Sequence, residues 1–319
     1  MKKNHVLIGA GLLVLAALAL GPKVSLVPSS HTIALDQDIT RYLANQEARF
    51  SDITDGAEKK LRWHNANKPE KTTFAIVYLH GFSATRQETA PLSEQLADQL
   101  GANVYYARLR GHGRGSAAMS EATADDWLRD TREAYEIGKA IGDKVVLIGV
   151  STGATLATWL GMQEDQDELA ALILISPNFG LADPSAKVLT MPWGLPLAEL
   201  LTGKTRSFEA SNEQHDKYWT STYALSAAAQ MMALLGYVDA LPLHEFDRPV
   251  LYIRSDSDRV IDMQKADEVF ELFASDVKET LIVTHTDDPY GHVIAGDILS
   301  PSSTPKVRQS ITNFIQALP

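Results

Sequence analysis

The stretch Lys144–Gly153, KVVLIGVSTG, closes a short apolar run with the pattern Gly-x-Ser-x-Gly. Its first part, Val145–Ile148, is too short and too β-branched for a helix and predicts a strand. The residues after Ser151 have helical periodicity instead. The pattern therefore places Ser151 at a sharp strand-to-helix turn, the setting in which a serine side chain is presented as a nucleophile.

The glycines beside this serine have a steric explanation. A serine at the tip of such a turn has a strained backbone, and side chains two residues away would collide, so Gly149 and Gly153 are small. The N–H groups at the start of the new helix point toward a developing oxyanion, and the helix dipole favours negative charge there. Taken alone, the five residues are also compatible with a glycine-rich turn that carries a solvated serine.

Length and charge narrow the class of protein. A chain of 319 residues can bury the core of one large α/β domain, with or without an insertion. Its net charge of −11 and the lack of a basic stripe argue against a nucleic-acid partner. The chain contains no cysteine, which excludes disulfides, thiol catalysis and thiolate metal sites.

The beginning of the chain has the features of a targeting or anchoring segment. Lys2 and Lys3 precede an unbroken apolar run, Val6–Leu20, which is long for a signal-peptide core and slightly short for a membrane span. Ala17-x-Ala19 resembles a cleavage motif but lies inside the apolar run. We therefore favour an uncleaved membrane anchor over a cleaved signal. The preceding positive charges place the rest of the chain outside the cytoplasm, on the periplasmic side if the chain is bacterial.

Strand and helix patterns alternate along most of the remaining chain. The expected strands are Lys60–His64, Thr72–Leu79, Val104–Arg108, Val145–Ile148, Ala170–Ile175, Pro249–Arg254 and Thr280–Thr284. The expected helices are Leu35–Phe50, Thr85–Leu100, Ala124–Ile141, Tyr223–Val238, Ile261–Phe273 and Pro305–Leu318. Repeated strand-then-helix units predict an α/β fold with a mostly parallel central sheet and helices on both faces.

The alternation lapses between Asn178 and Asp247, where prolines and aromatic residues surround one apolar helix and no strand pattern is evident. We interpret this stretch, about 178–247, as a helical cap inserted after the sixth strand of the sheet. The predicted organisation is an anchor or signal segment at 1–22, a tether at 23–34 and one domain over 35–319 that carries the cap.

An activated serine needs a base, and the base needs an orienting acid, in the chain order serine, acid, histidine. His285 and His292 lie late enough in the chain. We favour His292, because it lies in a loop beyond the last strand from which it can reach Ser151. The acid is expected after the strand that ends at Arg254. We prefer Asp258 to Asp256, and the other aspartate is interpreted as a turn or capping residue.

Two backbone N–H groups are expected to bind the oxyanion. One belongs to Thr152, directly after the serine, and the other to Phe82, in the loop after the strand Thr72–Leu79. Gly81 allows the backbone of that loop to approach closely.

Three further histidines are interpreted as structural or without a role. His112, within Arg110-Gly-His-Gly113, precedes the serine and is expected to brace loops at the carboxyl edge of the sheet. His215 and His244 in the cap have no partner at the spacing of metal ligands. No metal or cofactor is expected.

Taken together, these motifs resemble the α/β-hydrolase superfamily. They are His80-Gly81-Phe82, Arg110-Gly111-His112-Gly113, Gly149-x-Ser151-x-Gly153, Asp258 and Gly291-His292. Within the superfamily they are most similar to the monoacylglycerol lipase and lysophospholipase-like branch, which is also catalogued with the serine aminopeptidases of the S33 type. The resemblance covers about residues 60–318. It implies Ser151 as nucleophile, His292 as base and Asp258 as orienting acid, with a cap over an acyl pocket.

The chain departs from that branch around its serine. The branch usually has His and Met where Val150 and Thr152 stand, and a further Gly where Ala154 stands. These departures leave the mechanism intact but weaken any transfer of substrate class. Thr152 also counts against proline iminopeptidases, which usually place Trp there. Ser151 counts against dehalogenases and epoxide hydrolases of this fold, which use an aspartate.

The function that the sequence favours is hydrolysis of carboxylic esters, by a carboxylesterase or lipase-like enzyme that forms an acyl-enzyme. Monoacylglycerols and lysophospholipids are candidate substrates. Four cap residues, Trp193, Trp219, Tyr223 and Met232, indicate a pocket for an apolar acyl chain, although a packed lid core explains them equally well. The alternatives are acyl transfer, peptidase or carbon–carbon hydrolysis on the same triad, or a non-catalytic scaffold that binds an apolar ligand.

Overall fold

The computed structural model describes residues 20–30, 32–163 and 166–318. The apolar run predicted to anchor the chain, Val6–Leu20, thus lies outside the described residues except for its last position. Among the helices that are described, we find none with the length and apolar character required to span a bilayer.

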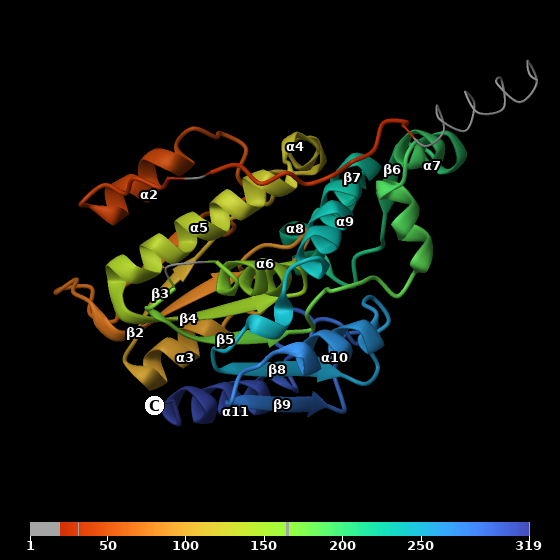
Figure 1. Cartoon of the computed structure of the whole chain (residues 1–319). Coiled ribbons are helices and arrows are strands. Elements are labelled where there is room, and N and C mark those ends of the chain that lie inside the picture. Colours follow the sequence, from red (N-terminus) through yellow and green to blue (C-terminus); the bar gives the residue numbers. More distant parts are fainter. Residues whose placement is uncertain (1–19, 31, 164–165, 319) are drawn as a thin grey trace, which may run out of the picture.

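Seven strands form the central sheet (Figure 1). Across the sheet they run in the order β1-β3-β2-β4-β5-β8-β9, and β1 alone among these described strands pairs antiparallel. The bounds are β1 (Lys60–Arg62), β2 (Thr72–Leu79), β3 (Asn103–Tyr106), β4 (Gly142–Val150), β5 (Leu169–Ile175), β8 (Val250–Ser255) and β9 (Lys278–Val283). The predicted mostly parallel α/β fold is confirmed.

The centre of the sheet is apolar on both faces. Successive side chains of β2 alternate between two cores: Val77 and Leu79 pack on one side, and Ile76 and Tyr78 on the other. Parallel strands need such cover on both faces, which explains why β2 and β4 are continuous apolar runs. Because Leu79 pairs with Gly149, the loops after β2 and β4 leave the sheet side by side.

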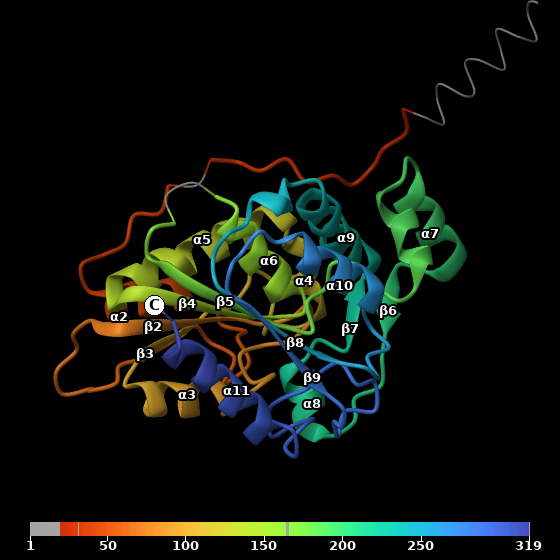
Figure 2. The ribbon, with the colours of Figure 1, turned by 60° about the horizontal axis from the view of Figure 1, so that its bottom comes forward.

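Helices cover the two faces of the sheet (Figures 1 and 2). One face carries α3 (Leu92–Leu100) and α11 (Thr304–Gln316), and the other carries α5 (Ala124–Ile141), α6 (Thr152–Gly161) and α10 (Met263–Leu272). Two shorter helices, α2 (Ile39–Glu47) and α4 (Ser116–Glu121), lie outside this layer. The helix expected from Thr85 begins only at Leu92, because Pro91 disfavours helical backbone in the residue before it.

The cap is inserted between β5 and β8 and contains η1 (Pro184–Thr190), α7 (Gly194–Thr202), α8 (Glu213–Tyr218), α9 (Leu225–Asp239) and η2 (Leu243–Glu245). It therefore follows the fifth strand of the sheet, and the expectation of a sixth was wrong. It also contains an unexpected hairpin, β6 (Thr205–Ser207) with β7 (Thr222–Ala224). Strands of three residues are too short to produce a recognisable alternation.

The segment predicted as a tether lies along the surface of the domain on the side of the cap (Figure 2). The backbone N–H and the hydroxyl of Ser29 donate to the Asp125 carboxylate at 2.9 and 2.7 Å. The Trp193 N–H, at the start of α7, donates to the Pro22 carbonyl at 2.8 Å. The first described residues are thus bound to the cap and to α5.

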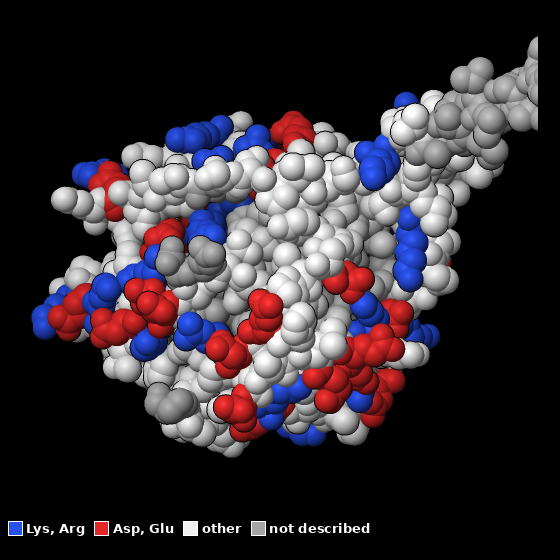
Figure 3. All heavy atoms as spheres, viewed as in Figure 1, with Lys and Arg blue, Asp and Glu red and all other residues white. Residues whose placement is uncertain are grey.

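Figure 3 shows how charge is distributed over one face of the molecule. Basic and acidic side chains are interspersed there, and acidic groups gather on the side of α10. On this face the basic side chains form no continuous stripe, in keeping with the net charge of −11.

Candidate active site

Ser151 sits between β4 and α6 with φ 51° and ψ −117°, a strained conformation for a residue that is not glycine. Its backbone N–H is held by the Ile175 carbonyl at 2.9 Å. A Cβ on Gly149 would lie 2.5 Å from the Gly153 carbonyl oxygen, and one on Gly153 would lie 2.1 Å from the Leu79 carbonyl oxygen. The turn can therefore form only with glycine at both positions.

The loop His80–Ser83 follows β2 and lies against this turn. A Cβ on Gly81 would be 3.3 Å from the Cβ of Ser151. His80 is fully buried, and its Nε2 accepts the Leu109 N–H at 3.1 Å, so Nδ1 carries the proton and donates to the Gly81 carbonyl at 2.9 Å. Because a trans peptide directs its C=O and N–H oppositely, this bond fixes where the Phe82 N–H points.

Burial, together with the neighbouring His112, holds the pKa of His80 well below its usual range. His80 is therefore neutral and can act as the donor that the loop requires. In the described part of the chain, no group accepts a hydrogen bond from the backbone N–H of Phe82 or of Thr152. Both remain available to a ligand, and the Thr152 N–H lies at the positive end of the α6 dipole.

His292 and Asp258 form a direct pair. The His292 Nδ1 lies 2.8 Å from the Asp258 Oδ2. The aspartate side chain is fully buried, and its other oxygen accepts the N–H groups of Val260 and Ile261 at 2.8 and 3.2 Å. This arrangement fixes the imidazole with Nδ1 as the donor and leaves Nε2 to accept a proton.

The loop that carries His292 is held by Asp288, which accepts the N–H groups of His292 and Val293 at 2.9 Å each. The Ser176 hydroxyl donates to the His292 carbonyl at 2.7 Å. Burial alone would lower the pKa of His292, but the charge and hydrogen bond of Asp258, with smaller contributions from Glu88 and Asp288, raise it above its usual value.

The alternatives that the sequence left open, Asp256 and His285, have partners outside this pair. Asp256 is exposed and pairs with Arg254. His285 is 81% exposed and lies 3.9 Å from Asp287. The structure therefore brings Asp258 and His292 together, and neither Asp256 nor His285 joins them.

Comparison with known proteins places the chain in a family. The family model described as serine aminopeptidase, S33, matches residues 70–286. The chain belongs to this S33 family. A curated relative, the thermostable monoacylglycerol lipase of Bacillus sp. (strain H-257), is 27% identical over 211 residues, which are 66% of this chain and 80% of that protein.

Solved structures show the same fold. One comes from work on LipS and LipT, described as two metagenome-derived lipolytic enzymes. It has a TM-score of 0.67 at 20% identity, and the match covers 83% of this chain and 99% of the other. A soluble variant of the monoglyceride lipase from Saccharomyces cerevisiae has a TM-score of 0.60 at 15% identity, with 82% and 93% covered. This S33 protein thus has the α/β-hydrolase fold that the sequence motifs predicted.

The cap of this S33 protein contacts both loops of the site. The Thr220 N–H donates to the Ser83 carbonyl at 2.8 Å. Tyr223 packs edge-on against Phe82, with ring centroids 5.0 Å apart. Trp219 is buried with Ala84 and Val293, and Val293 directly follows His292. Two of the four predicted pocket residues therefore touch the loops that hold the site.

The other two predicted pocket residues lie elsewhere in the cap. Met232 is buried within α9. Trp193 is 40% exposed at the start of α7, and its indole ring lies against Gly21. The structure does not bring Trp193 to the loops around Ser151.

His112 also has a place near the site. Its ring packs against those of His80 and Phe82, with centroids 4.9 and 5.9 Å away. Burial lowers its pKa to about 4, so it is neutral at ordinary pH. It braces the loop after β2, as the sequence indicated.

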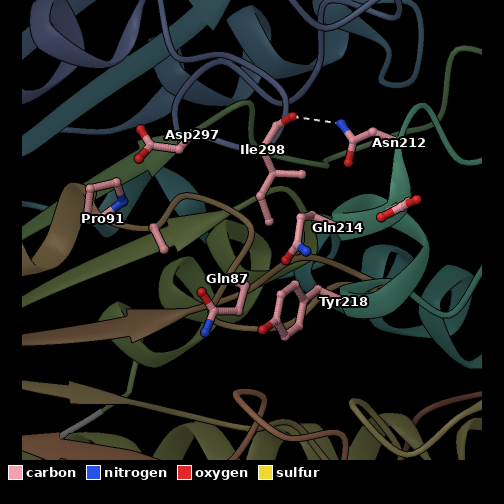
Figure 4. A pocket seen from close by; sticks show the side chains of 9 residues that line it. Gln87, Pro91, Asn212, Gln214, Tyr218, Asp297 and Ile298 are labelled. Atoms are coloured by element: carbon pink, nitrogen blue, oxygen red, sulfur yellow. Dashed lines mark hydrogen bonds between the residues drawn. The ribbon is translucent and has the colours of Figure 1, made fainter.

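A hollow of about 660 Å³ opens beside the cap (Figure 4). Gln87 and Pro91 line it from the main domain, and Asn212, Gln214 and Tyr218 from the cap. The loop at 297–298 completes it, with the Ile298 carbonyl accepting from the Asn212 amide at 3.0 Å. Polar and apolar side chains both line it, whereas the contacts around Trp219 are apolar.

Two supporting carboxylates were missed by the sequence analysis, Asp288 in the loop before His292 and Glu88 after the loop His80–Ser83. An aspartate four residues before the predicted base gave a local signal for Asp288. Glu88 lies in a stretch that was interpreted as helix, and its role depends on contacts that no spacing reveals.

Proposed function

We propose that this protein hydrolyses carboxylic esters with apolar acyl chains, using Ser151, His292 and Asp258. The observation that carries the proposal is the 2.8 Å contact between His292 and the buried Asp258, on loops that leave the same edge of the sheet as the strained serine turn. An imidazole oriented in this way with a free Nε2 is the general base that a serine nucleophile requires.

The chemistry follows from this arrangement. His292 Nε2 takes the proton of Ser151 as its Oγ attacks the ester carbonyl. The N–H groups of Thr152 and Phe82 hold the resulting oxyanion, each such donor contributing about 3–4 kcal/mol to transition-state stabilisation. His292 then gives its proton to the leaving alcohol, and a water molecule activated by the same imidazole hydrolyses the acyl-enzyme.

The substrate class is supported by the cap and by the curated relative. Trp219 and Tyr223 give an apolar border to the site, and the relative from Bacillus is named a monoacylglycerol lipase. The test is a series of nitrophenyl esters of increasing chain length, beside monoacylglycerol and amino-acid anilides. We expect turnover of esters, with a preference for one range of chain length. Turnover of anilides alone would favour a peptidase instead.

Cap variants should change this preference. In Trp219→Ala and Tyr223→Ala, the apolar border beside Phe82 and Val293 is lost, so we expect the ratio of kcat/KM for long and short esters to change by about five-fold or more, since one lost apolar contact is worth about 1–3 kcal/mol. Trp193→Ala, at the outer end of the cap, serves as the control and should leave the ratio unchanged. A fall in melting temperature with an unaltered ratio would assign these residues to cap packing only.

We also propose that residues 1–22 attach the protein to a membrane with the hydrolase domain outside the cytoplasm. The charge pattern of that segment is one support. The other is that Leu200 and Leu201 of α7 are 79% and 80% exposed, on the helix whose N-cap residue, Trp193, contacts Pro22. Fractionation of the full chain should recover it with membranes, and N-terminal sequencing should find its first residue. A soluble mature protein starting near Leu20 or Ser25 would show a cleaved signal instead.

A further inference from the structure

Glu88 is a buried carboxyl group that contacts the loop His80–Ser83. It is 2% exposed, and its Oε2 accepts the Gly81 N–H at 2.9 Å and the Tyr78 hydroxyl at 3.1 Å. In the described chain no Lys or Arg lies within ion-pair distance of it. A carboxyl group buried without a cation is costly, so packing alone does not account for it.

The position of Gly81 explains what this carboxyl group reaches. A Cβ on Gly81 would lie 2.7 Å from the Glu88 Oε1 and 3.3 Å from the Cβ of Ser151. The carboxyl group and the nucleophile therefore both border the space that a side chain at Gly81 would occupy. Gly81 is held from two sides, with its N–H bound by Glu88 and its carbonyl bound by the Nδ1–H of His80.

On the basis of the proposed ester hydrolysis, we propose that Glu88 is a positioning residue. Its carboxyl group binds the Gly81 N–H and so keeps the Phe82 N–H directed at the oxyanion that forms beside Ser151. His80 fixes the peptide that joins Gly81 to Phe82, because it binds the Gly81 carbonyl. Glu88 fixes the peptide that joins His80 to Gly81, because it binds the Gly81 N–H. Neither bond alone determines the orientation of both planes.

The environment of Glu88 supplies a readout that a purely structural side chain lacks. Burial raises the pKa of Glu88 to about 7, against the opposing effects of the Gly81 N–H, the positive charge of His292 and the Tyr78 hydroxyl. These are the groups that face it, Tyr78 from β2 and His292 from the loop after β9. In turn, ionised Glu88 contributes to the raised pKa of His292, as Asp258 and Asp288 do.

The charge of Glu88 determines the direction in which the pH dependence of hydrolysis should shift. Hydrolysis needs neutral His292, so activity is lost as the pH falls through the pKa of its imidazole. Glu88→Gln keeps an oxygen acceptor for the Gly81 N–H but removes the negative charge, which lowers the pKa of His292. The acid limb of kcat/KM should therefore move to lower pH, with kcat at its plateau within about three-fold of wild type, because the oxyanion donors are unchanged.

Glu88→Ala removes the acceptor as well. We expect kcat per active site to fall about 10- to 100-fold with little change in KM, less than the loss of a whole oxyanion donor, because the Phe82 N–H is misdirected rather than absent. Active sites are counted by complete reaction with a fluorophosphonate. Hydrogen exchange of the amides in residues 80–83 should also be faster. The matched control is Glu133→Ala, which removes a carboxylate that is also buried (6% exposed) but is bound to Tyr42 and Lys59.

Two results would overturn the proposal. One is wild-type kcat per active site in Glu88→Ala, and the other is an equal loss in Glu88→Gln and Glu88→Ala, since charge rather than the bond to Gly81 would then matter. If the alanine variant does not fold, an acid limb in Glu88→Gln that coincides with wild type counts against the proposal as well. Activity retained by Ser151→Ala would instead refute the proposed function, and exchange at residues 80–83 would still decide the role of Glu88.

Discussion

Replacing Ser151 with alanine should lower kcat for ester hydrolysis by about 10⁴-fold or more, because the acyl-enzyme can no longer form and only the oxyanion donors and substrate binding remain. The fold should persist, since no hydrogen bond of the Ser151 side chain caps α6 and the backbone strain is the same with alanine. Rates with a nitrophenyl ester and labelling by a fluorophosphonate probe measure the loss. We expect the probe to label wild type and not the variant.

A suitable control for this variant is Ser120→Ala. Ser120 is exposed on α4, and its hydroxyl contacts only a backbone carbonyl of its own helix among the described residues. This variant should keep wild-type rate and labelling. Equal labelling of wild type and Ser151→Ala would show that the nucleophile is another residue.

Asp258→Asn should be nearly as damaging, with kcat reduced by about 10⁴-fold. An amide in place of the carboxylate can donate to Nδ1 of His292. The imidazole would then carry its proton on Nε2, and Nε2 could no longer accept the proton of Ser151. The variant also loses the charge that stabilises the imidazolium. Because the amide oxygen can still accept the N–H groups of Val260 and Ile261, we expect the loop to keep its shape and the melting temperature to change little.

The neighbouring aspartate provides the comparison. Asp256 is exposed and pairs with Arg254, so Asp256→Asn should keep kcat within about two-fold, as is usual for surface ion pairs. Both variants are measured with the same ester and both are checked by thermal unfolding. A severe loss in Asp256→Asn with a mild one in Asp258→Asn would make Asp256 the orienting acid.

The parts of the fold that the sequence predicted well are those set by local pattern. Continuous apolar runs indicated β2, β4, β5 and β8, and the glycines around Ser151 indicated the strand-to-helix turn, because a Cβ at either position meets backbone atoms. The preference for His292 over His285 and for Asp258 over Asp256 rested on loop position alone. The structure places the preferred pair 2.8 Å apart.

What the sequence did not reveal depends on contacts between distant segments. The turns at residues 86–91 replace the first part of an expected helix, and Glu88 within them binds the Gly81 N–H. The hairpin of β6 and β7 is too short to have a pattern. Trp193 was assigned to the pocket by its aromatic character, whereas the structure places it against Gly21 and Pro22.

The site is assembled from loops that are far apart in the chain, and this has a consequence for how the protein acquires its activity. Asp258 and His292 are 34 residues apart, and both are more than 100 residues from Ser151. Contacts of such long range form late and slowly, because chain entropy must be lost before they stabilise the fold. During synthesis the serine turn and its strands are complete long before His292 has been added. A nascent or C-terminally truncated chain would therefore carry the proposed nucleophile without its proposed base, and we expect ester hydrolysis to report that the whole domain has folded.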